Sequence, residues 1–262
     1  MTYRRIRKAK FFVDEITARI NRGRDITDFS NDGRAFNTGC DQYDLIDLDP
    51  YNVATWDTSA VTDDIVSLGW NSGLSSANGH NFLAILNHNL DTAQGMIRIS
   101  SHTSAPGEGE GTEPSGISVT LNGSAADVDT GQDLTATMSA LDTSFTVAER
   151  APFVVGHKVS IGDEIFKVTS TGSGAGTVGV TPAATNTHAS GTSVYFTEYI
   201  VPATNGDTLI EFTASSQQYW QVEFVPEDGD WSATDLQVGA VMLGRTYTTP
   251  VSPDMSISTG YN

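Results

Sequence analysis

The sequence contains a single cysteine, Cys40, among 262 residues. One thiol excludes an internal disulfide and a metal centre built from several thiolates. Long apolar runs are also lacking, because the longest, such as Phe82–Leu86 and Val238–Leu243, fall far short of the roughly 20 residues that cross a bilayer. The basic start of the chain is interrupted by Asp14 and Glu15 before it can form the apolar core of a secretory signal. We therefore expect no membrane insertion, and synthesis in the cytoplasm.

Basic residues are scarce, with 14 Lys and Arg against 32 Asp and Glu, which gives a formal net charge of −18. Their distribution is uneven, since residues 1–34 carry nine basic and five acidic side chains, a net of +4, and leave −22 for the rest. An acidic body repels polyanions. We therefore expect no nucleic-acid binding by residues 35–262.

The first 34 residues are predicted to form an extended basic arm. Its densest group of basic side chains comprises Arg4, Arg5, Arg7, Lys8 and Lys10. Such a group can contact nucleic acid or dock on the acidic surface of a neighbouring subunit. Five clustered basic residues are few for a nucleic-acid arm, so we favour docking, and these residues are the candidate assembly contacts.

Periodicity predicts an all-β protein. Short segments rich in Val, Ile, Thr, Phe and Tyr alternate with clusters of Gly, Asn, Asp, Ser and Pro, a spacing typical of sandwiches and jelly rolls. In Gln218–Val225 the alternation predicts one buried face, with Gln221 and Glu223 on the other. Phe12–Ile20 has helical spacing, although the same residues also suit a strand. The segments predicted as strands are Asn52–Trp56, Asp64–Leu68, Asn81–Leu86, Gly95–Ser100, Ile117–Leu121, Ser144–Val147, Lys158–Ile161, Glu164–Thr169, Thr177–Val180, Thr192–Tyr199, Thr208–Thr213, Gln218–Val225 and Leu236–Leu243.

A change in composition divides the chain. The stretch SAPGEGEGTEPS, residues 104–115, has no large apolar side chain and is typical of a linker. Residues 115–196 contain none of the four tryptophans, which suggests a small β-domain inserted into a larger one. We therefore predict a basic arm (1–34), a β-sandwich (35–105 with 197–250), a linker (106–114), an inserted β-domain (115–196) and a C-terminal tail (251–262).

His88, flanked by Asn87 and Asn89 at the end of an apolar run, is the most conspicuous candidate for chemistry. A general base needs a positioned partner, and no Ser, Cys or carboxylate pair follows a recognisable spacing around it. Short polar side chains commonly satisfy backbone groups at a turn. We favour that interpretation and predict no catalytic residue, and hence no enzymatic activity.

Metal and phosphate sites are also incomplete in the sequence. Neither group of aspartates completes a calcium loop, and His80 with His88 provides too few ligands for zinc. The carboxylates of Glu108, Glu110 and Glu113 lie in the Gly-rich linker, which cannot hold a glycosidase pair at a fixed separation. The Gly-rich segment 172–176 lacks the Lys of a phosphate loop and suits a hairpin. We predict no metal and no cofactor. The two aspartate groups are Asp41, Asp44, Asp47 and Asp49, and Asp127, Asp129 and Asp133.

Several segments together resemble a family of bacteriophage virion proteins from long tails, with a galactose-binding-like jelly roll. In that family an apolar strand ends in a His-Asn turn, and a late aromatic strand and a Gly-containing strand complete the sandwich. The segments are FFVDEITARINRG, YDLIDLDPYNVATWDT, NFLAILNHNLDTAQGMIRIS, QQYWQVEFVPEDG and LQVGAVMLGRTY. Residues 142–147, 155–168 and 188–195 are similar to a small β-module that recurs in phage tail and fibre proteins.

The resemblance implies a jelly roll with an inserted module, and a structural protein of the virion at the distal tail, tail tip or baseplate. Implied partners are other virion proteins and copies of the chain in a ring, with a tail fibre or a host-surface glycan as further contacts. Jelly rolls of this family often hold a structural calcium. A capsid decoration protein and a carbohydrate-binding module remain alternatives.

Three tryptophans are the candidate glycan contacts if the chain is a carbohydrate-binding module. Trp56, Trp70 and Trp231 lie near segments expected to be loops, where aromatic faces can stack on sugars. Tryptophan is, however, highly buried on average, so we favour a place for all three in the core or a subunit interface.

Overall fold

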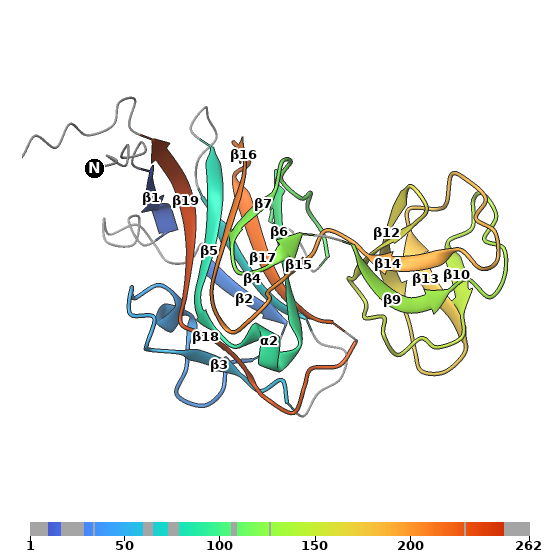
Figure 1. Cartoon of the computed structure of the whole chain (residues 1–262), viewed down its shortest axis with the longest axis horizontal. Coiled ribbons are helices and arrows are strands. Elements are labelled where there is room, and N and C mark those ends of the chain that lie inside the picture. Colours follow the sequence, from blue (N-terminus) through green and yellow to red (C-terminus); the bar gives the residue numbers. More distant parts are fainter. Residues whose placement is uncertain are drawn as a thin grey trace, which may run out of the picture.

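The computed structural model describes residues 10–16, 29–33, 35–59, 65–72, 79–105, 109–125, 127–227 and 229–248, and only the backbone of 29–33. The regular structure of the described residues is nearly all β, as the sequence predicts. Two sheets form a sandwich at one end of the molecule, and a smaller β unit lies against one side of it (Figure 1).

The first sheet of the sandwich contains five antiparallel strands. Its strand order is β1 (Lys10–Asp14), β19 (Ala240–Thr248), β5 (His80–His88), β16 (Gly206–Ser215) and β7 (Ser118–Leu121). Lys10–Asp14 is therefore a strand at the edge of the sheet, so the helical alternative for Phe12–Ile20 is wrong for Phe12–Asp14, whereas Glu15 and Ile16 are helical and residues 17–20 lie outside the described residues. Pairing with β19 decides this, because a five-residue segment has too few helical hydrogen bonds to compete with a ladder.

The second sheet has six strands and packs on the first. Its strand order is β2 (Phe29–Gly33), β4 (Val66–Asn71), β17 (Tyr219–Pro226), β6 (Gly95–His102), β15 (Ile200–Val201) and β8 (Ser124–Ala125). A two-stranded ribbon of β3 (Ala54–Trp56) and β18 (Leu236–Val238) closes one end, near the short helices η2 (Gln42–Leu45) and α2 (Leu90–Ala93). None of the described helices is long and apolar enough to span a membrane.

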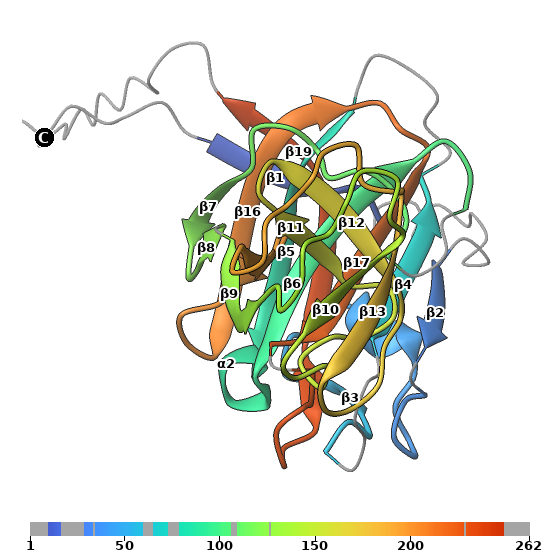
Figure 2. The same cartoon turned by 90° about the vertical axis from the view of Figure 1, so that its right-hand side faces the viewer.

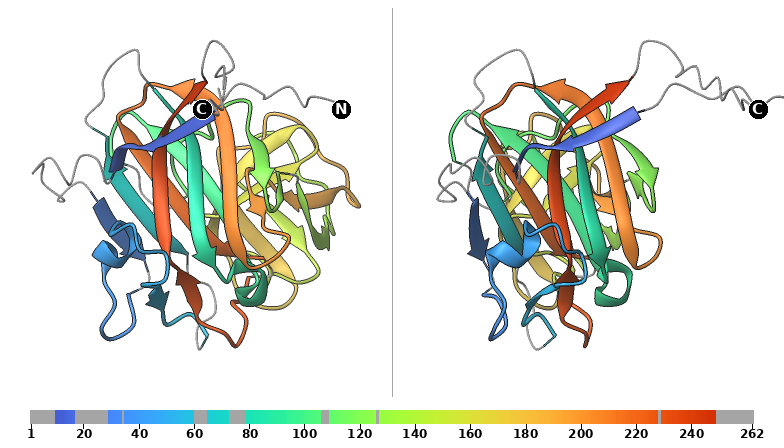
Figure 3. Two further views of the ribbon diagram at one scale, coloured as in Figure 1. Left: turned by 60° about the vertical axis from the view of Figure 1, so that its left-hand side comes forward. Right: turned by 90° about the vertical axis from the view of Figure 1, so that its left-hand side faces the viewer.

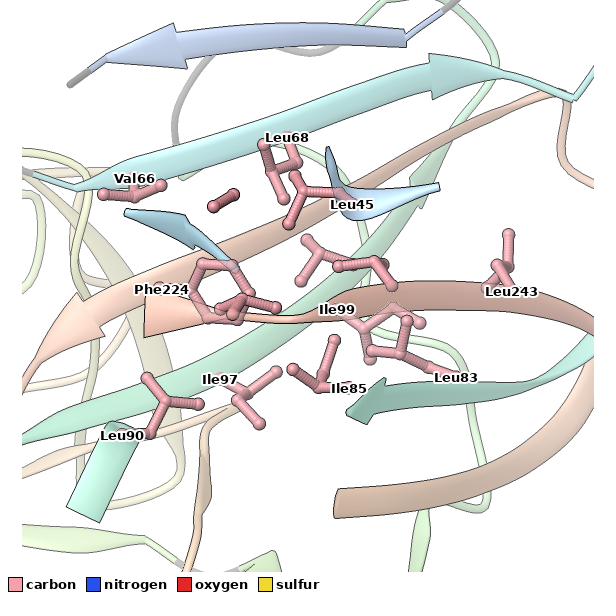
Figure 4. Close-up of a cluster of buried hydrophobic side chains, with 14 of the residues drawn as sticks. Leu45, Val66, Leu68, Leu83, Ile85, Leu90, Ile97, Ile99, Phe224 and Leu243 are labelled. Atoms are coloured by element: carbon pink, nitrogen blue, oxygen red, sulfur yellow. The ribbon is translucent and has the colours of Figure 1, made fainter. Parts of the chain in front are cut away.

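The core of the sandwich follows from the alternation of side chains along the strands. Leu83 and Ile85 of β5 face Ile97 and Ile99 of β6, and all four are fully buried. Figure 4 shows the labelled side chains of both sheets gathered between the ribbons. Burial of each such side chain contributes roughly 1.5–3 kcal/mol, so this layer holds the two sheets together.

The inserted unit has its own six-stranded antiparallel sheet and its own core. Figure 2 shows it in front of the sandwich when the molecule is viewed from that side. Phe166 and Val168 are buried while Lys167 and Thr169 are not, as their alternation predicts. The strand order is β10 (Ser144–Val147), β13 (Gly176–Thr181), β12 (Glu164–Ser170), β11 (Lys158–Ile161), β14 (Ser193–Phe196) and β9 (Val128–Asp133).

Strand pairing differs from the predicted boundaries of the insert. The sequence places its start at residue 115, but β7 pairs with β16 and β8 pairs with β15, so residues 118–125 belong to the sandwich. The separate sheet begins at Val128. Composition could not reveal this, because β7 and β8 are short edge strands rich in Ser and Thr like the insert itself. The predicted tail, 251–262, lies outside the described residues.

The predicted strand Leu236–Leu243 is in fact two strands, β18 and β19, which separate at Gly239. A Cβ atom at position 239 would lie 2.1 Å from the carbonyl oxygen of Pro50. Only glycine allows this close approach of two backbones. The chain can therefore pass from the small ribbon into the five-stranded sheet.

Candidate functional site

The junction between the sandwich and the inserted unit is the most elaborate polar site in the described part of the chain. It forms where the insert covers the outer face of the six-stranded sheet. Met96 of β6 and Val225 of β17 belong to one buried cluster with Phe153 and Val154 of the insert. The core of the inserted unit thus continues into the sandwich.

Two glycines let the backbones of the two units touch. A Cβ atom at Gly109 would lie 2.1 Å from the carbonyl oxygen of Gly156, and one at Gly229 would lie 2.1 Å from that of Ala151. Both glycines also have positive φ angles, 63° and 84°. A larger residue at either position would be strained and would push the units apart. The predicted linker is therefore part of the junction rather than a free tether.

Arg98 lies at the centre of this junction and is fully buried. Its Nη1 donates to Oε2 of Glu223 at 2.7 Å, and its Nη2 donates to Oε2 of Glu198 at 2.9 Å. The same guanidinium donates to the carbonyl oxygens of Glu110 at 2.9 Å and Gly111 at 3.3 Å. It thus binds two carboxylates and the linker backbone together, and the hydrogen bonds to the carboxylates are charge-assisted.

Glu223 completes the network from the neighbouring strand. It stands directly opposite Arg98 in the β17–β6 register. Its Oε1 accepts the backbone N–H of Gly109 at 2.6 Å. Both oxygens of this carboxylate therefore accept from donors of the chain, although only 1% of Glu223 is exposed.

The sequence predicts that strand β17 buries only one face and exposes Gln221 and Glu223 on the other, and this prediction is wrong. Gln221 and Glu223 are 2% and 1% exposed, because the inserted unit and the linker cover the face that the alternation assigns to solvent. A signal for this was present in the sequence. An Arg in the apolar segment Gly95–Ser100 and a Glu in the apolar segment Gln218–Val225 carry opposite charges, which is the composition expected of a buried ion pair.

Burial alters the ionisation of several groups around Arg98. Burial alone would lower the pKa of Arg98, but the carboxylate of Glu223 raises it above its ordinary value. Burial raises the pKa of Glu113 to about 7, and the nearby charge of Glu198 adds to the effect. Burial lowers the pKa of Lys158 and raises that of Tyr199, whose hydroxyl accepts the Lys158 N–H at 2.9 Å. The hydrogen bonds of Arg98 join the sandwich to the linker and to the returning chain at Glu198, so this network holds both connections of the insert against the sandwich.

His88 lies at a corner of the sheet. Its Nδ1 accepts the backbone N–H of Leu90 at 3.3 Å, so the proton must be on Nε2, which lies 2.8 Å from Oγ1 of Thr208. The Thr208 hydroxyl donates onward to the carbonyl oxygen of Asn122 at 3.0 Å. Burial lowers the pKa of His88 to about 4, which keeps the ring neutral. Both ring nitrogens are thus used within the fold.

The flanking asparagines bind backbone groups in the same way. Asn87 Nδ2 donates to the carbonyl oxygen of Pro50 at 2.7 Å, and Asn89 Nδ2 donates to that of Asp235 at 2.8 Å. Asn87 has a positive φ of 48°, a conformation that asparagine tolerates better than most residues. These contacts match the turn interpretation of the motif.

All three candidate glycan tryptophans lie in the interior. Trp56 is fully buried and stacks on Phe36 with ring centroids 4.8 Å apart. Trp70 and Trp231 are each 6% exposed. A sugar ring needs an open aromatic face for stacking. In this conformation none of the three presents one.

Most of the candidate assembly arm lies outside the described residues, namely Arg4, Arg5, Arg7 and Lys8. Lys10 is the first residue of β1. It forms an ion pair with Glu211 and lies 5.6 Å from the centroid of the Phe12 ring. Lys10 is therefore part of the folded sandwich.

The aspartates that suggested a calcium site stabilise local turns. Asp41 accepts the backbone N–H of Tyr43 at 2.7 Å, and Asp49 accepts that of Tyr51 at 3.0 Å. His80 and His88 lie at opposite ends of β5, too far apart to share an ion. Among the described residues, no three His, Cys, Asp or Glu side chains are placed to hold a metal ion.

Comparison with known proteins gives no match, whether with protein-family models, curated proteins or solved structures.

Proposed function

We propose that the chain is a structural component of a bacteriophage virion, located in the distal tail near the tip or baseplate. It would be made in the host cytoplasm and act by assembly with other virion proteins and with copies of itself in a ring. The resemblance of the outer segments and of the insert to phage tail proteins is the support for a tail as the particle. The resemblance implies no catalytic residues, which agrees with a protein that acts by assembly.

The locked junction is the observation that carries this proposal. Arg98 joins two carboxylates and the linker backbone, and two glycines bring the units into backbone contact. The sandwich and the insert therefore form one rigid body with a fixed projection. A subunit that holds a projecting unit in a fixed orientation within a particle needs that rigidity. A binding module on a flexible tether does not.

The direct test is the position of the protein in purified particles. An antibody raised against residues 128–196 should label the tail tip in electron micrographs. Label over the head would instead assign the chain to capsid decoration. Particles without label would contradict the virion role and favour the carbohydrate-binding alternative, which glycan binding by the purified protein would then test.

The basic arm provides a second test. Removal of residues 1–9 takes away Arg4, Arg5, Arg7 and Lys8 but leaves β1 intact. We expect this variant to fold and to be absent from particles, because the arm is proposed to dock on acidic neighbours. Removal of residues 249–262, which follow the neighbouring strand β19, is the matched control and should leave incorporation unchanged.

A further inference from the structure

Strand β1 leaves one edge of the five-stranded sheet open. It pairs with β19 through all five of its residues, and no strand of the described residues pairs with its other side. Figure 3 shows β1, in blue, crossing in front of the upper part of this sheet, on the side away from the inserted unit. There Phe12 packs on Phe82 of β5 with ring centroids 5.1 Å apart. An open edge offers backbone N–H and C=O groups to another strand.

The side chains of this edge are unusually apolar. Phe11, Phe12 and Val13 are consecutive and are 56%, 37% and 41% exposed. Natural edge strands are commonly protected by proline, a bulge, charges or shortness. The short strand β1 has no proline and no bulge, and its two charges, Lys10 and Asp14, stand at its ends. The centre of β1 therefore suits contact with a partner strand better than contact with water.

The sequence of β1 is complementary to itself when one copy is reversed. If two copies pair antiparallel about Phe12, Lys10 of each faces Asp14 of the other, and Phe11 faces Val13. Directly opposite residues share a face of the sheet, so these are charge pairs and apolar pairs in contact. A parallel, in-register pair would instead place Lys10 against Lys10 and Asp14 against Asp14, which is unfavourable.

We propose that two copies of this chain associate through β1, antiparallel about Phe12, so that their five-stranded sheets become one continuous sheet. The contact is isologous, because each copy contributes the same strand to a two-fold axis. This contact rests on the proposed assembly role for its biological setting and adds to it, because an isologous contact joins copies in pairs and the proposed ring needs separate, heterologous contacts. The contact itself is measured on purified protein, so its failure and a failure of the virion role are distinguishable.

Charge reversal tests the pairing. By sedimentation equilibrium, the full chain should be a dimer, and Asp14→Lys should raise its dissociation constant by about tenfold, because two opposite-charge pairs become like-charge pairs. The double variant Lys10→Asp with Asp14→Lys restores complementarity and should recover the dimer, provided that Glu211→Gln is made in the same background, because Lys10 pairs with Glu211 within the fold. Glu211→Gln alone should leave the dimer unchanged. Asp163→Lys makes the same charge change on an exposed turn of the insert and should have no effect.

Cross-linking tests the register in a Cys40→Ser background. Phe12→Cys should form a disulfide-linked dimer at the two-fold axis. Phe11→Cys alone should not, but a mixture of Phe11→Cys and Val13→Cys proteins should cross-link. The proposal would be overturned by a protein that is monomeric at all concentrations. It would also be overturned by a dimer that neither the charge reversal nor the position of the cysteine affects. Either result would favour a different protein as the partner of this edge.

Discussion

Arg98 donates from Nη1 to Oε2 of Glu223 at 2.7 Å, across two neighbouring strands that face the inserted unit. Neither residue is more than 1% exposed. A buried pair of this kind contributes little net stability compared with well-packed apolar residues, but the loss of one partner leaves an uncompensated charge. Its value to this protein is geometric, because the same guanidinium also binds the linker and the returning chain at Glu198.

Replacement of Arg98 by Met should lower the free energy of unfolding by about 3–5 kcal/mol, since Glu223 would stay buried without its partner. The double variant Arg98→Met with Glu223→Gln should recover much of this loss, because it removes the stranded charge. Denaturant unfolding of the four proteins in this cycle measures both effects. Equal losses in the single and the double variant would contradict the role of the pair.

His88 should make stability depend on pH below neutrality. Its pKa in the folded protein, about 4, lies below the ordinary 6.5, so the unfolded chain binds a proton that the folded chain does not. The contribution of His88 to stability should therefore fall by on the order of 3 kcal/mol as the pH decreases from 6.5 to 4, and change little below that. His157, whose pKa burial lowers to about 3, adds a decline of the same sign.

The variant His88→Asn separates the two histidines. The shorter amide can still accept the Leu90 N–H but loses the contact with Thr208, so we expect a loss of about 1 kcal/mol at pH 7.5. From pH 6.5 to 4 the difference between wild type and variant should pass through zero and reverse, because only the wild type loses on the order of 3 kcal/mol through this titration. The variant should be the more stable protein at pH 4. Parallel stability curves would show that His88 is not buried in its neutral form.

Glu113 should produce the opposite dependence. Its pKa is raised to about 7 in the folded protein, so the folded state holds a proton that the unfolded state has released. The contribution of this proton to the free energy of unfolding is fully present below about pH 4.5 and is lost as the pH rises through 7. The variant Glu113→Gln should be the more stable protein at pH 8, by roughly 1–2 kcal/mol, a value discounted for the partial exposure of the side chain.

A neighbouring glutamate provides the control for this measurement. The side chain of Glu110 is 52% exposed and lies 3.8 Å from Lys167. Glu110→Gln removes the same charge from the same segment and should change stability by less than about 1 kcal/mol. A similar gain in both variants at pH 8 would point to the overall acidity of the chain rather than to Glu113.

Replacement of Trp56 by Ala should destabilise the sandwich by about 3–5 kcal/mol, because it opens a cavity beside Phe36 in the core. The control is Tyr51→Ala, at a residue that is 86% exposed, and it should change stability by less than about 0.5 kcal/mol. Thermal unfolding measures both. A Trp56→Ala protein of unchanged stability that loses saturable sugar binding would favour the carbohydrate-binding alternative.

Much of the strand content could be predicted, because alternation and turn residues are local. Ser144–Val147 and Lys158–Ile161 are strands with the predicted bounds, and the helices are short. Strands β2, β8, β9 and β15 were missed, since short or polar segments become strands only through their neighbours. The Asn87-His88-Asn89 turn could be interpreted from its residue types because such side chains bind backbone groups nearby.

By itself the sequence determined the all-β fold, the acidic body and the lack of an internal disulfide, because each depends on composition or on the period of the strands. Only the tertiary structure decided which strands pair, that the linker binds Arg98, and that both faces of β17 are buried. Those features arise between residues such as Arg98 and Glu223, which are 125 positions apart in the chain. The physical reason is that segments far away in the sequence pack on a strand and bury its face, so the alternation within the strand does not reveal it.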